Sequence, residues 1–560
     1  MSIGSTKLQV VQVKALPPGT DEYEKQRAAI LERLAVKVPS DLILPPSLIA
    51  DPPNDVSSIP TTCGLLTDRE IDITEYYNAV SLARSIATKD LSAVEVTRAF
   101  AKRAIIAHQL TCCLTQWFVD EALERARELD EYLEKHGKPI GPLHGVPISI
   151  KEHIPVAGTF SSQGTLASTV LSERDSHMVA ILRKAGAVFY CKTNQPQAIM
   201  HLESTSHFGR TLNPFNIQLS AGGSTGGEAA LVAMKGSVLG VGTDIGGSVR
   251  GPSAFCGIYG YKATSETLPM KDFLATSFAA ELNVLCSTGP MCRSLEDMEL
   301  FVHVLKNAEP WLEDQSLVPL PWTGLDTTLS KPLKIGLIEN DGFIIPQPPV
   351  QRAIEWAKTR LNDPKLASIL QVKAFQPYNA EEAWRRIRRS YWPQGGSTLK
   401  AGLKESGEPI MPLTEHVCSD AEPFGMLTAE DVNQLRSERD QYRHAFADHW
   451  REQDIDLVIG PAFVGPASAH DSAFYWTYTS LYNFVDYPGV VIPTPIRARS
   501  EEPYPQDYTP LSKECEHVRK LWGESNFEGA PIDLQIVARR HQDNLLFGAL
   551  AMLKPILDLP

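Results

Sequence analysis

Two serines framed by glycines are the residues of this chain whose types and spacing could do chemistry. Ser224 stands within GGSTGGE, and Ser248 stands within DIGGSVRG. Glycine doublets are costly in backbone entropy, so they are expected where the backbone turns tightly or must bring its N–H groups close to a ligand. The segment from Gly222 to Lys262 therefore predicts a reaction site in which a serine hydroxyl takes part.

Several common motifs do not fit these serines. A phosphate-binding P-loop needs a lysine that neither glycine cluster supplies. The third glycine of a dinucleotide fingerprint is replaced by Ile245, and Arg250 stands where the elbow of an α/β-hydrolase has glycine. Ser397 and Lys400 form an S-x-x-K without a KTG partner. A Ser/His/Asp triad stays open, since the chain has 14 histidines but none in a recognisable setting.

The chain resembles the amidase signature family in several separate motifs. GVGTDIGGSVRGPSAFCGIYGYK is close to that family's central motif, and GGSTGGE is similar to its GGSSGGE. Lys151 precedes Ser224 by 73 residues and Ser224 precedes Ser248 by 24, in the family's order and spacing. The resemblance covers about residues 67–555 and continues through KTNQPQ (192–197), FGRTLNPFN (208–216), STGPMCRSLEDM (287–298), YNFVDYP (482–488) and APIDLQIV (530–537).

This resemblance implies a catalytic triad. It places the nucleophile at Ser248, a bridging serine at Ser224 and the base at Lys151, with a cis peptide bond between Gly223 and Ser224. A lysine can act as a base only when it is neutral, which requires its pKa to fall from about 10.4 to about 7. Burial among neutral hydroxyls lowers a lysine pKa, whereas a close carboxylate raises it. We therefore expect Lys151 to be buried without a carboxylate beside it.

The same resemblance assigns roles around the nucleophile. The backbone N–H groups of Ile245, Gly246, Gly247 and Ser248 correspond to the family's oxyanion hole. The supporting residues are Thr225, which stands where the family usually has a second serine, Asp244 and Arg250. Glu152 replaces the aspartate that usually follows the catalytic lysine. We also expect substrate contacts from a further set of residues, which are Ile199, Met200, Gly222, Gly223, Trp384, Tyr391, Trp392, Phe424 and Tyr482.

The elements that must position these residues indicate an α/β protein. Val146, Ile148 and Ile150 alternate with Ser149 and Lys151, as in a half-buried strand. Helix and strand patterns follow one another at 177–186, 187–191, 333–339 and 349–361, and further strands are predicted at 454–460 and 531–537. Together with the resemblance, this predicts a single large domain with a mixed central β-sheet surrounded by α-helices.

The flanking segments have a different character. Residues 1–66 are predicted to form an N-terminal arm with a helix at 22–36, and residues 67–560 to form the amidase signature domain. A mostly helical, polar insertion is expected at about 363–453. A helix starting with a Ser92–Glu95 capping box, a second helix closed by Gly137 and a final helix at 544–557 complete the prediction.

Composition restricts the function classes. The formal net charge of -14 disfavours nucleic acid and anionic membranes as partners. No run of about 18 apolar residues could span a membrane, and no signal peptide is recognised. Nine cysteines without CxxC or CxxH spacing disfavour a disulfide framework and a structural zinc site. We expect a cytoplasmic protein without cofactor or metal, whose partner is a small-molecule amide, and a homodimer remains allowed.

The sequence thus predicts a serine hydrolase that cleaves linear carboxylic amides to acid and ammonia or amine through an acyl-enzyme. GRTLNP and YNFVDYP favour the fungal acetamidase-like branch. The alternatives are an acyltransferase or an ester or carbamate hydrolase that uses the same acyl-enzyme, and an amidotransferase-type subunit. The acidic charge and the N-terminal arm argue against the last of these.

Overall fold

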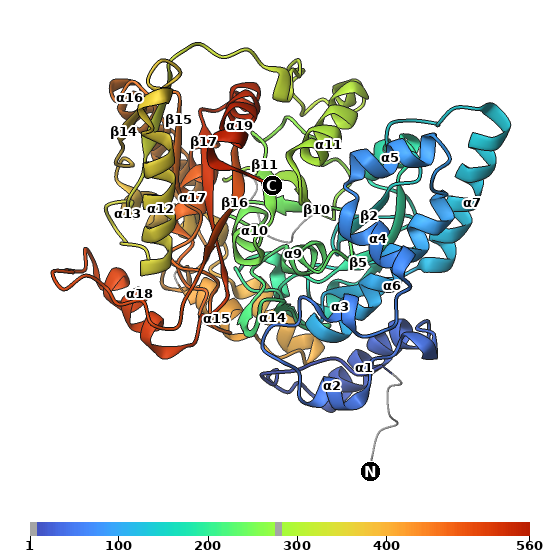
Figure 1. The fold of residues 1–560 in the computed structure, drawn as a ribbon. Helices are drawn as coiled ribbons and strands as arrows, with labels where there is room; N and C mark the ends of the chain where they lie inside the picture. The colour runs from blue at the N-terminus through green and yellow to red at the C-terminus, as the bar shows by residue number, and fades with distance from the viewer. Residues whose placement is uncertain (1–7, 275–282, 420) are drawn as a thin grey trace.

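A mixed sheet of eleven strands runs through the centre of the molecule (Figure 1). The computed structural model describes residues 8–274, 283–419 and 421–560. In spatial order the strands of the sheet are β1 (Leu114–Trp117), β5 (Val188–Thr193), β2 (Pro147–Lys151), β10 (Leu239–Asp244), β12 (Ser287–Cys292), β11 (Tyr259–Lys262), β16 (Gly489–Arg497), β17 (Pro531–Ala538), β15 (Leu457–Pro461), β13 (Leu333–Leu337) and β14 (Leu370–Ala374). The three small pairs beside it are β3 (Phe160–Ser161) with β4 (Val170–Leu171), β6 (Thr205–Ser206) with β7 (Gly209–Arg210), and β8 (Leu212–Asn213) with β9 (Asn216–Ser220).

Helices surround this sheet, which confirms the predicted fold class (Figure 1). Those in the first half of the chain are α1 (Asp21–Ala35), α2 (Pro46–Ala50), α3 (Ile59–Thr62), α4 (Asp68–Tyr76), α5 (Ala79–Ala87), α6 (Ala93–Thr111), α7 (Val119–His136), α8 (His177–Lys184), α9 (Gly226–Ala233) and α10 (Arg250–Cys256). Those in the second half are α11 (Leu295–Asn307), α12 (Pro348–Leu361), α13 (Ala380–Tyr391), α14 (Ser397–Ser406), α15 (Pro412–Ser419), α16 (Ala429–Glu452), α17 (Thr477–Phe484), α18 (Lys513–Glu524) and α19 (Asp543–Leu557). None of the described helices is long and apolar enough to cross a bilayer.

Strand β2 is more deeply buried than its sequence pattern predicts. The alternation of apolar and polar residues indicated one solvated face, yet every residue of β2 is buried, including Ser149 and Lys151. The reason is its position in the sheet, because β2 pairs in parallel with both β5 and β10. Parallel sheets are covered on both faces. Polar side chains on β2 must therefore find partners inside the protein.

Two predicted helix ends can be compared with the structure. Ser92 caps α6 and accepts a hydrogen bond from the N–H of Glu95 at 3.0 Å. The carboxylate of Glu95 instead accepts from Arg69 Nε at 3.0 Å, so only half of the predicted capping box is formed. Helix α7 ends as predicted at Gly137, which takes the left-handed conformation (φ 64°).

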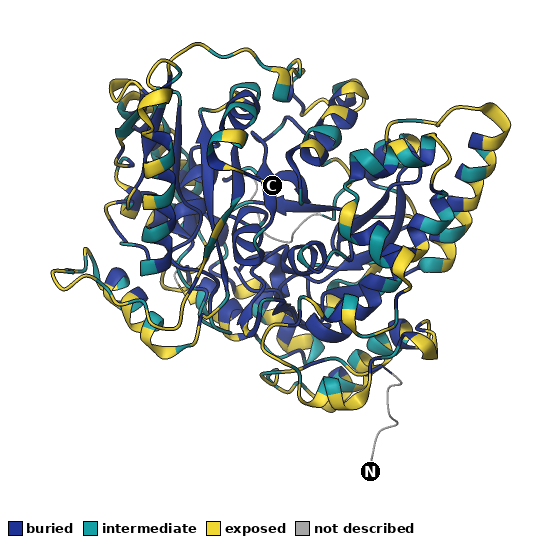
Figure 2. Cartoon of the chain, in the orientation of Figure 1, coloured by how far each residue is buried: buried dark blue, intermediate teal, exposed yellow. Residues whose placement is uncertain are grey.

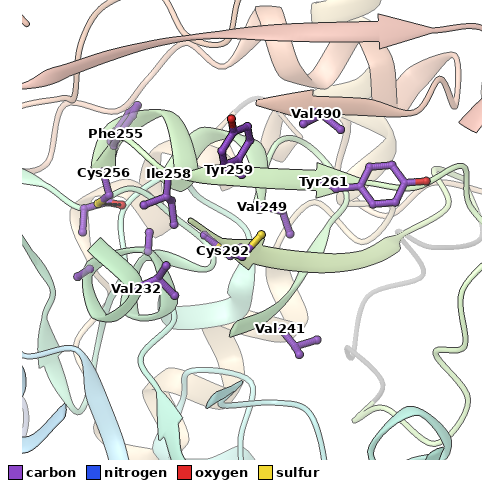
Figure 3. Packing of buried hydrophobic residues seen from close by; sticks show 14 of the residues in the cluster. Val232, Val241, Val249, Phe255, Cys256, Ile258, Tyr259, Tyr261, Cys292 and Val490 are labelled. Carbon is purple, nitrogen blue, oxygen red and sulfur yellow. Dashed lines mark hydrogen bonds between the residues drawn. The ribbon is translucent and has the colours of Figure 1, made fainter. Parts of the chain in front are cut away.

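The core is continuous around the segment that carries the two serines. Figure 2 shows that the strands and the inner helices are almost entirely buried, and exposed residues gather on the outer helices and loops. Val232 of α9, Val249 and Phe255 belong to the same buried cluster as Val241 of β10 and Tyr259 of β11 (Figure 3). Helices α9 and α10, which follow the two glycine-framed serines, are therefore anchored in the core, and the turns before them are held in place.

Candidate active site

The predicted triad lies at one edge of the central sheet. Lys151 is the last residue of β2, and Thr243 and Asp244 end β10. These two strands are parallel neighbours, so their carboxyl ends meet at the same edge. Ser224 stands just before α9, and Ser248 stands just before α10. The fold thus brings residues from three distant segments of sequence to one place.

Lys151 has hydroxyl groups as neighbours. Its Nζ lies 2.6 Å from Ser224 Oγ and 3.1 Å from Thr243 Oγ1, and these are the hydrogen bonds that it forms with described residues. The side chain is fully buried. Burial lowers the pKa of Lys151 to about 7, although Asp244 and Glu228 act in the opposite direction. Lys151 is therefore largely neutral just above neutral pH, as a general base requires.

Glu228 stays close to Lys151 without offering it a full negative charge. Burial raises the pKa of Glu228 to about 8, so the carboxyl group holds its proton near neutral pH. Ser149 donates a 2.5 Å hydrogen bond to Glu228 Oε2 and lies on the same strand as Lys151. Glu228 was not singled out from the sequence, although it is the last residue of the GGSTGGE motif. Its protonated state helps to keep the lysine neutral.

The two serine turns are tied to each other. The N–H of Thr225 donates to the carbonyl oxygen of Ser248 at 3.1 Å. The peptide bond between Gly223 and Ser224 is cis, as the family resemblance implied. Ser224 is buried, whereas Ser248 is partly accessible. This arrangement places the hydroxyl of Ser224 beside the lysine and leaves Ser248 open to a substrate.

Asp244 holds the turn that carries Ser248. Its carboxylate accepts from the backbone N–H groups of Gly247 and Val249 at 2.8 and 3.1 Å. It also accepts from both Nε and Nη2 of Arg250, each at 3.1 Å, and from Asn483 Nδ2 at 2.8 Å. Burial alone would raise the pKa of Asp244, but the Arg250 guanidinium and these hydrogen bonds hold it well below its usual range. Asp244 and Arg250 thus form a fully buried ion pair that fixes the turn.

The N–H groups of this turn divide into two kinds. Gly247 N–H is bonded to Asp244, whereas those of Ile245, Gly246 and Ser248 make no hydrogen bond to another described residue. The carbonyl oxygen of Ile245 accepts from Tyr391 Oη at 2.8 Å. Because the C=O and N–H of a trans peptide point in opposite directions, this bond also fixes the direction of the Gly246 N–H. Three free donors therefore remain beside Ser248, and the predicted donor Gly247 is already used by Asp244.

Thr479, on α17, also positions the turn. Its Oγ1 donates to the carbonyl oxygen of Gly246 at 2.9 Å. Thr243, Thr479 and Asn483 were not singled out from the sequence, because a threonine or asparagine in a strand or helix carries no local sign of a catalytic neighbour. Thr243 and Asn483 do lie in motifs that the resemblance included, GVGTDIGGSVRGPSAFCGIYGYK and YNFVDYP, whereas Thr479 lies in none of them.

Ser248 lies between two cavities of very different size. The narrow cavity is lined by residues 199–202, Ile245, Gly246, Tyr391 and Trp476. The wide cavity contains both Ser224 and Ser248. The centre of a water molecule can move within about 10 Å³ of the narrow cavity and within about 440 Å³ of the wide one. The narrow cavity therefore has room for about one methyl-sized group.

The residues expected to contact substrate are only partly found at these cavities. Ile199 and Met200 line both of them. Trp384 instead packs edge-on behind Trp476, with ring centroids 5.0 Å apart, and Tyr482 is buried in the core. Tyr391 does line the narrow cavity, as expected, together with Trp476, which was not singled out from the sequence.

Gly222 and Gly223 also have a packing role that was not expected. A Cβ on Gly222 would lie 2.6 Å from Pro252 Cα, and one on Gly223 would lie 2.5 Å from the carbonyl oxygen of His201. Neither glycine is among the lining residues of the two cavities. Both positions thus need glycine for close backbone contact with the chain itself rather than with a substrate. In the described part of the chain, no group of three or more His, Cys, Asp or Glu side chains is arranged to hold a metal ion.

Comparison with known proteins agrees with this geometry. The Amidase family model matches residues 95–547. The chain belongs to the amidase signature family. It is 41% identical over 500 residues to a Schizosaccharomyces pombe protein with a provisional amidase assignment, covering 89% of this chain and 92% of that one. It is 35% identical to the acetamidase of Emericella nidulans, covering 87% and 90% of the two chains.

A solved structure extends this similarity to the fold. A fatty acid amide hydrolase superposes with a TM-score of 0.87 at 33% identity, covering 96% of this chain and 94% of that one. With the family match and the named amidases, this makes the protein a hydrolase that acts on amides, as its sequence predicted.

Proposed function

We propose that this amidase cleaves linear carboxylic amides through an acyl-enzyme, with Ser248 as nucleophile, Ser224 as proton carrier and Lys151 as base. The observation that carries the proposal is the environment of Lys151. Its amine is buried, has a pKa of about 7 and lies 2.6 Å from the hydroxyl of Ser224. A neutral amine in hydrogen-bond contact with a hydroxyl can take the proton of that hydroxyl.

The first step forms the acyl-enzyme. Ser248 Oγ attacks the carbonyl carbon of the amide as its proton passes to Ser224, while the proton of Ser224 passes to Lys151. The carbonyl oxygen becomes an oxyanion, and in this proposal it accepts from the N–H groups of Ile245, Gly246 and Ser248, which have no partner among the described residues. One such donor is worth about 3 kcal/mol of the barrier. When the C–N bond breaks, Lys151 returns the proton through Ser224 to the leaving nitrogen.

The second step releases the acid. A water molecule takes the place of the amine and attacks the acyl carbon, with Ser224 and Lys151 again accepting its proton. The C–O bond to Ser248 then breaks, and Ser248 regains a proton from Ser224. Acid and amine are the products, and the enzyme returns to its initial protonation state.

The position of Ser224 orients the substrate between the two cavities. Ser224 must reach the leaving nitrogen, and it lines the wide cavity but not the narrow one. The amine side of the amide therefore extends into the wide cavity, and the acyl side enters the narrow cavity beside Tyr391 and Trp476. Since that cavity has room for about one methyl group, we propose short acyl groups such as acetyl as the substrates.

Active-site labelling tests the nucleophile. A fluorophosphonate should add its mass to the peptide that contains Ser248, and Ser248→Ala should abolish this addition. Ser253, a buried serine on α10, provides a matched control through Ser253→Ala. If the folded protein remains unlabelled at Ser248, the nucleophile assignment is incorrect.

A panel of amides tests the orientation and the reaction. Acetamide and N-benzylacetamide should be cleaved with much higher kcat/KM than hexanamide, because only the amine side has space. Comparable cleavage of hexanamide would contradict the acyl assignment of the narrow cavity. Hydroxylamine in the same assay reports acyl transfer, since it converts the acyl-enzyme to a hydroxamate, and hydroxamate formed in preference to acid would favour an acyltransferase.

A reducing cytoplasmic location and the division at residue 66 also remain part of the proposal. No disulfide joins cysteines in the described part of the chain, which supports a reducing compartment. Cell fractionation tests the location, and expression of residues 67–560 alone tests whether the predicted domain folds without its arm.

A further inference from the structure

A further cavity, distinct from the two at Ser248, lies between α1 and the edge of the sheet. It has a volume of about 490 Å³, within the usual range of small-molecule sites. Its inner wall consists of five aromatic side chains, and neither catalytic serine nor Lys151 lines it. We call it the α1 groove, and its aromatic wall is formed by Trp117, Phe118, Phe160, Phe189 and Phe208.

Cations outnumber carboxylates among the side chains that line the α1 groove. Four cationic side chains line it, against the single carboxylate of Glu121. Three of the four already have carboxylate partners: Lys37 with Glu121 at 3.9 Å, Arg125 with Glu128 at 2.9 Å, and Arg183 with Asp175 at 2.7 Å. The fourth cation, Arg33, is different.

Arg33 has no carboxylate partner and no side-chain hydrogen bond in the part of the chain that the structure describes. Its guanidinium lies over the ring of Phe160, with Cζ 4.7 Å from the ring centroid. A cation held by an aromatic face keeps its N–H groups available for an anion. The side chain is exposed, so a ligand can reach it from solvent.

The rim of the α1 groove exposes several large apolar side chains to solvent. Val36, which lines the groove, is 64% exposed. Leu171 is 56% exposed and pairs across β3 and β4 with Phe160 of the groove, and its neighbour Val170 is 48% exposed. Three of the nine large hydrophobic side chains that are exposed among the described residues thus lie at this place. Apolar surface beside an open cavity is typical of a site that binds an apolar group.

We propose that the α1 groove binds a free amphipathic carboxylate, with the carboxylate on Arg33 and an alkyl or arylalkyl body against the aromatic wall. The ligand is expected to be an anion, because Arg33 is a cation that has no carboxylate partner in the described chain. The aromatic wall selects the apolar body. A short acid such as acetate has no body to fill the groove and is bound weakly.

The groove also touches the polar residues behind the catalytic lysine. Thr115 and Gln116 line it, and Thr115 Oγ1 donates a 2.6 Å hydrogen bond to Glu152, the residue after Lys151. Gln116 Nε2 donates to the carbonyl oxygen of Phe160 at 2.7 Å. The α1 groove is therefore linked through Thr115 to the residue after Lys151, but neither catalytic serine lines it.

Calorimetric titration of the full chain tests the charge requirement. Octanoate should bind, octan-1-ol should bind about tenfold more weakly, and Arg33→Gln should reduce octanoate binding to the level of the alcohol. Arg84→Gln is the matched control, because Arg84 on α5 is also exposed and has no ion pair in the described chain. Equal octanoate binding by the wild-type protein and Arg33→Gln would overturn the proposal.

Photo-crosslinking tests the location independently of the variants. A medium-chain carboxylic acid that carries an alkyl diazirine should label peptides containing residues 115–125 or 156–160. Labelling confined to peptides with Met200 or Ser248 would place the ligand in the active site and overturn the proposal. Binding to anionic vesicles is measured as a third test. If the protein binds vesicles but not monomeric octanoate, the groove is a membrane-binding surface and the proposal is overturned.

Discussion

Two fully buried lysines of the same sheet have opposite surroundings. Lys151 ends β2 and contacts the hydroxyl oxygens of Ser224 and Thr243. Lys262 ends β11 and donates to the carbonyl oxygens of Ala263 and Tyr487 at 3.0 and 3.1 Å, with Asp486 at 3.7 Å. Burial lowers the pKa of both lysines, but at Lys262 the charge of Asp486 opposes this shift.

The difference teaches what makes a buried lysine a base. Carbonyl and carboxylate oxygens can only accept hydrogen bonds, so they favour the charged ammonium of Lys262. Hydroxyl groups can donate as well as accept, so they can deliver a proton to the amine of Lys151. Burial alone therefore does not identify the base, and the chemistry of the neighbouring oxygens does.

The largest expected effect comes from removing each lysine in turn. Lys151→Met should lower kcat/KM by about 10³-fold, because no other group can take the proton of Ser224. Lys262→Met should leave kcat/KM within a few-fold at low temperature and instead lower the stability by about 2 kcal/mol, through its lost charged hydrogen bonds. Steady-state kinetics and urea unfolding measure the two outcomes. A folded Lys262→Met enzyme with an equally large kinetic loss would show that the two lysines do not differ in role.

The pH dependence gives the next largest effect. Lys151 accepts a proton only in its neutral form, which is depleted below its pKa of about 7. Activity should therefore rise with pH through about 7 and reach a plateau, and at pH 5 kcat/KM should be about 100-fold below the plateau. Lys262→Met should keep the same midpoint, since Lys262 does not contact the proton pathway. A midpoint that moves with Lys262 would assign the titration to the wrong lysine.

Adding a carboxylate beside Lys151 should make it resemble Lys262. Thr243→Asp places a negative charge near Nζ, which raises the lysine pKa by at least one unit. At pH 7 the activity should fall about fivefold or more, because the neutral fraction of the lysine falls, and it should recover at higher pH. The pH profile of the variant checks this, and the isosteric variant Thr243→Asn, which adds no charge, is its control. An unchanged midpoint in folded Thr243→Asp would contradict the electrostatic explanation.

The smallest effect is expected from removing one hydroxyl neighbour. Thr243→Val keeps the shape of the side chain but loses a hydrogen bond of about 0.5–1.5 kcal/mol, so kcat/KM should fall about 2- to 10-fold. Thr288→Val is a matched control, because Thr288 on β12 donates to the carbonyl oxygen of Gly242 at 2.8 Å and does not contact Lys151. An equal loss in both variants would indicate a general effect on the sheet.

Much of the fold was predictable from local patterns. Helix α12 and strands β5, β13 and β17 lie within two residues of their predicted ranges, since their apolar spacing is strong and their ends carry clear signals. Glu95 shows the limit of such patterns. Its side chain was assigned to a capping box, but Arg69 competes for it across 26 residues of sequence.

The motif residues of the candidate site could be predicted from the sequence, whereas the lining of its cavities could be predicted only in part. Lys151, Ser224 and Ser248 could be named from motifs with family order and spacing. The residues that line the narrow cavity were harder to predict. Trp384 and Tyr391 belong to the same helix, and only packing decides which of the two side chains lies beside Ser248. Trp476 comes from another element and shows no motif of its own.

The sequence by itself determined the glycine-framed serines, the spacing to Lys151 and hence the family and its chemistry. Only the tertiary structure decided the state of Lys151, because burial lowers its pKa and because its hydrogen-bond partners Ser224 and Thr243 come from other segments. The narrow cavity beside Ser248 and the α1 groove were likewise decided by packing between distant elements. A residue type fixes which proton transfers are possible, and the three-dimensional environment fixes which of them occurs.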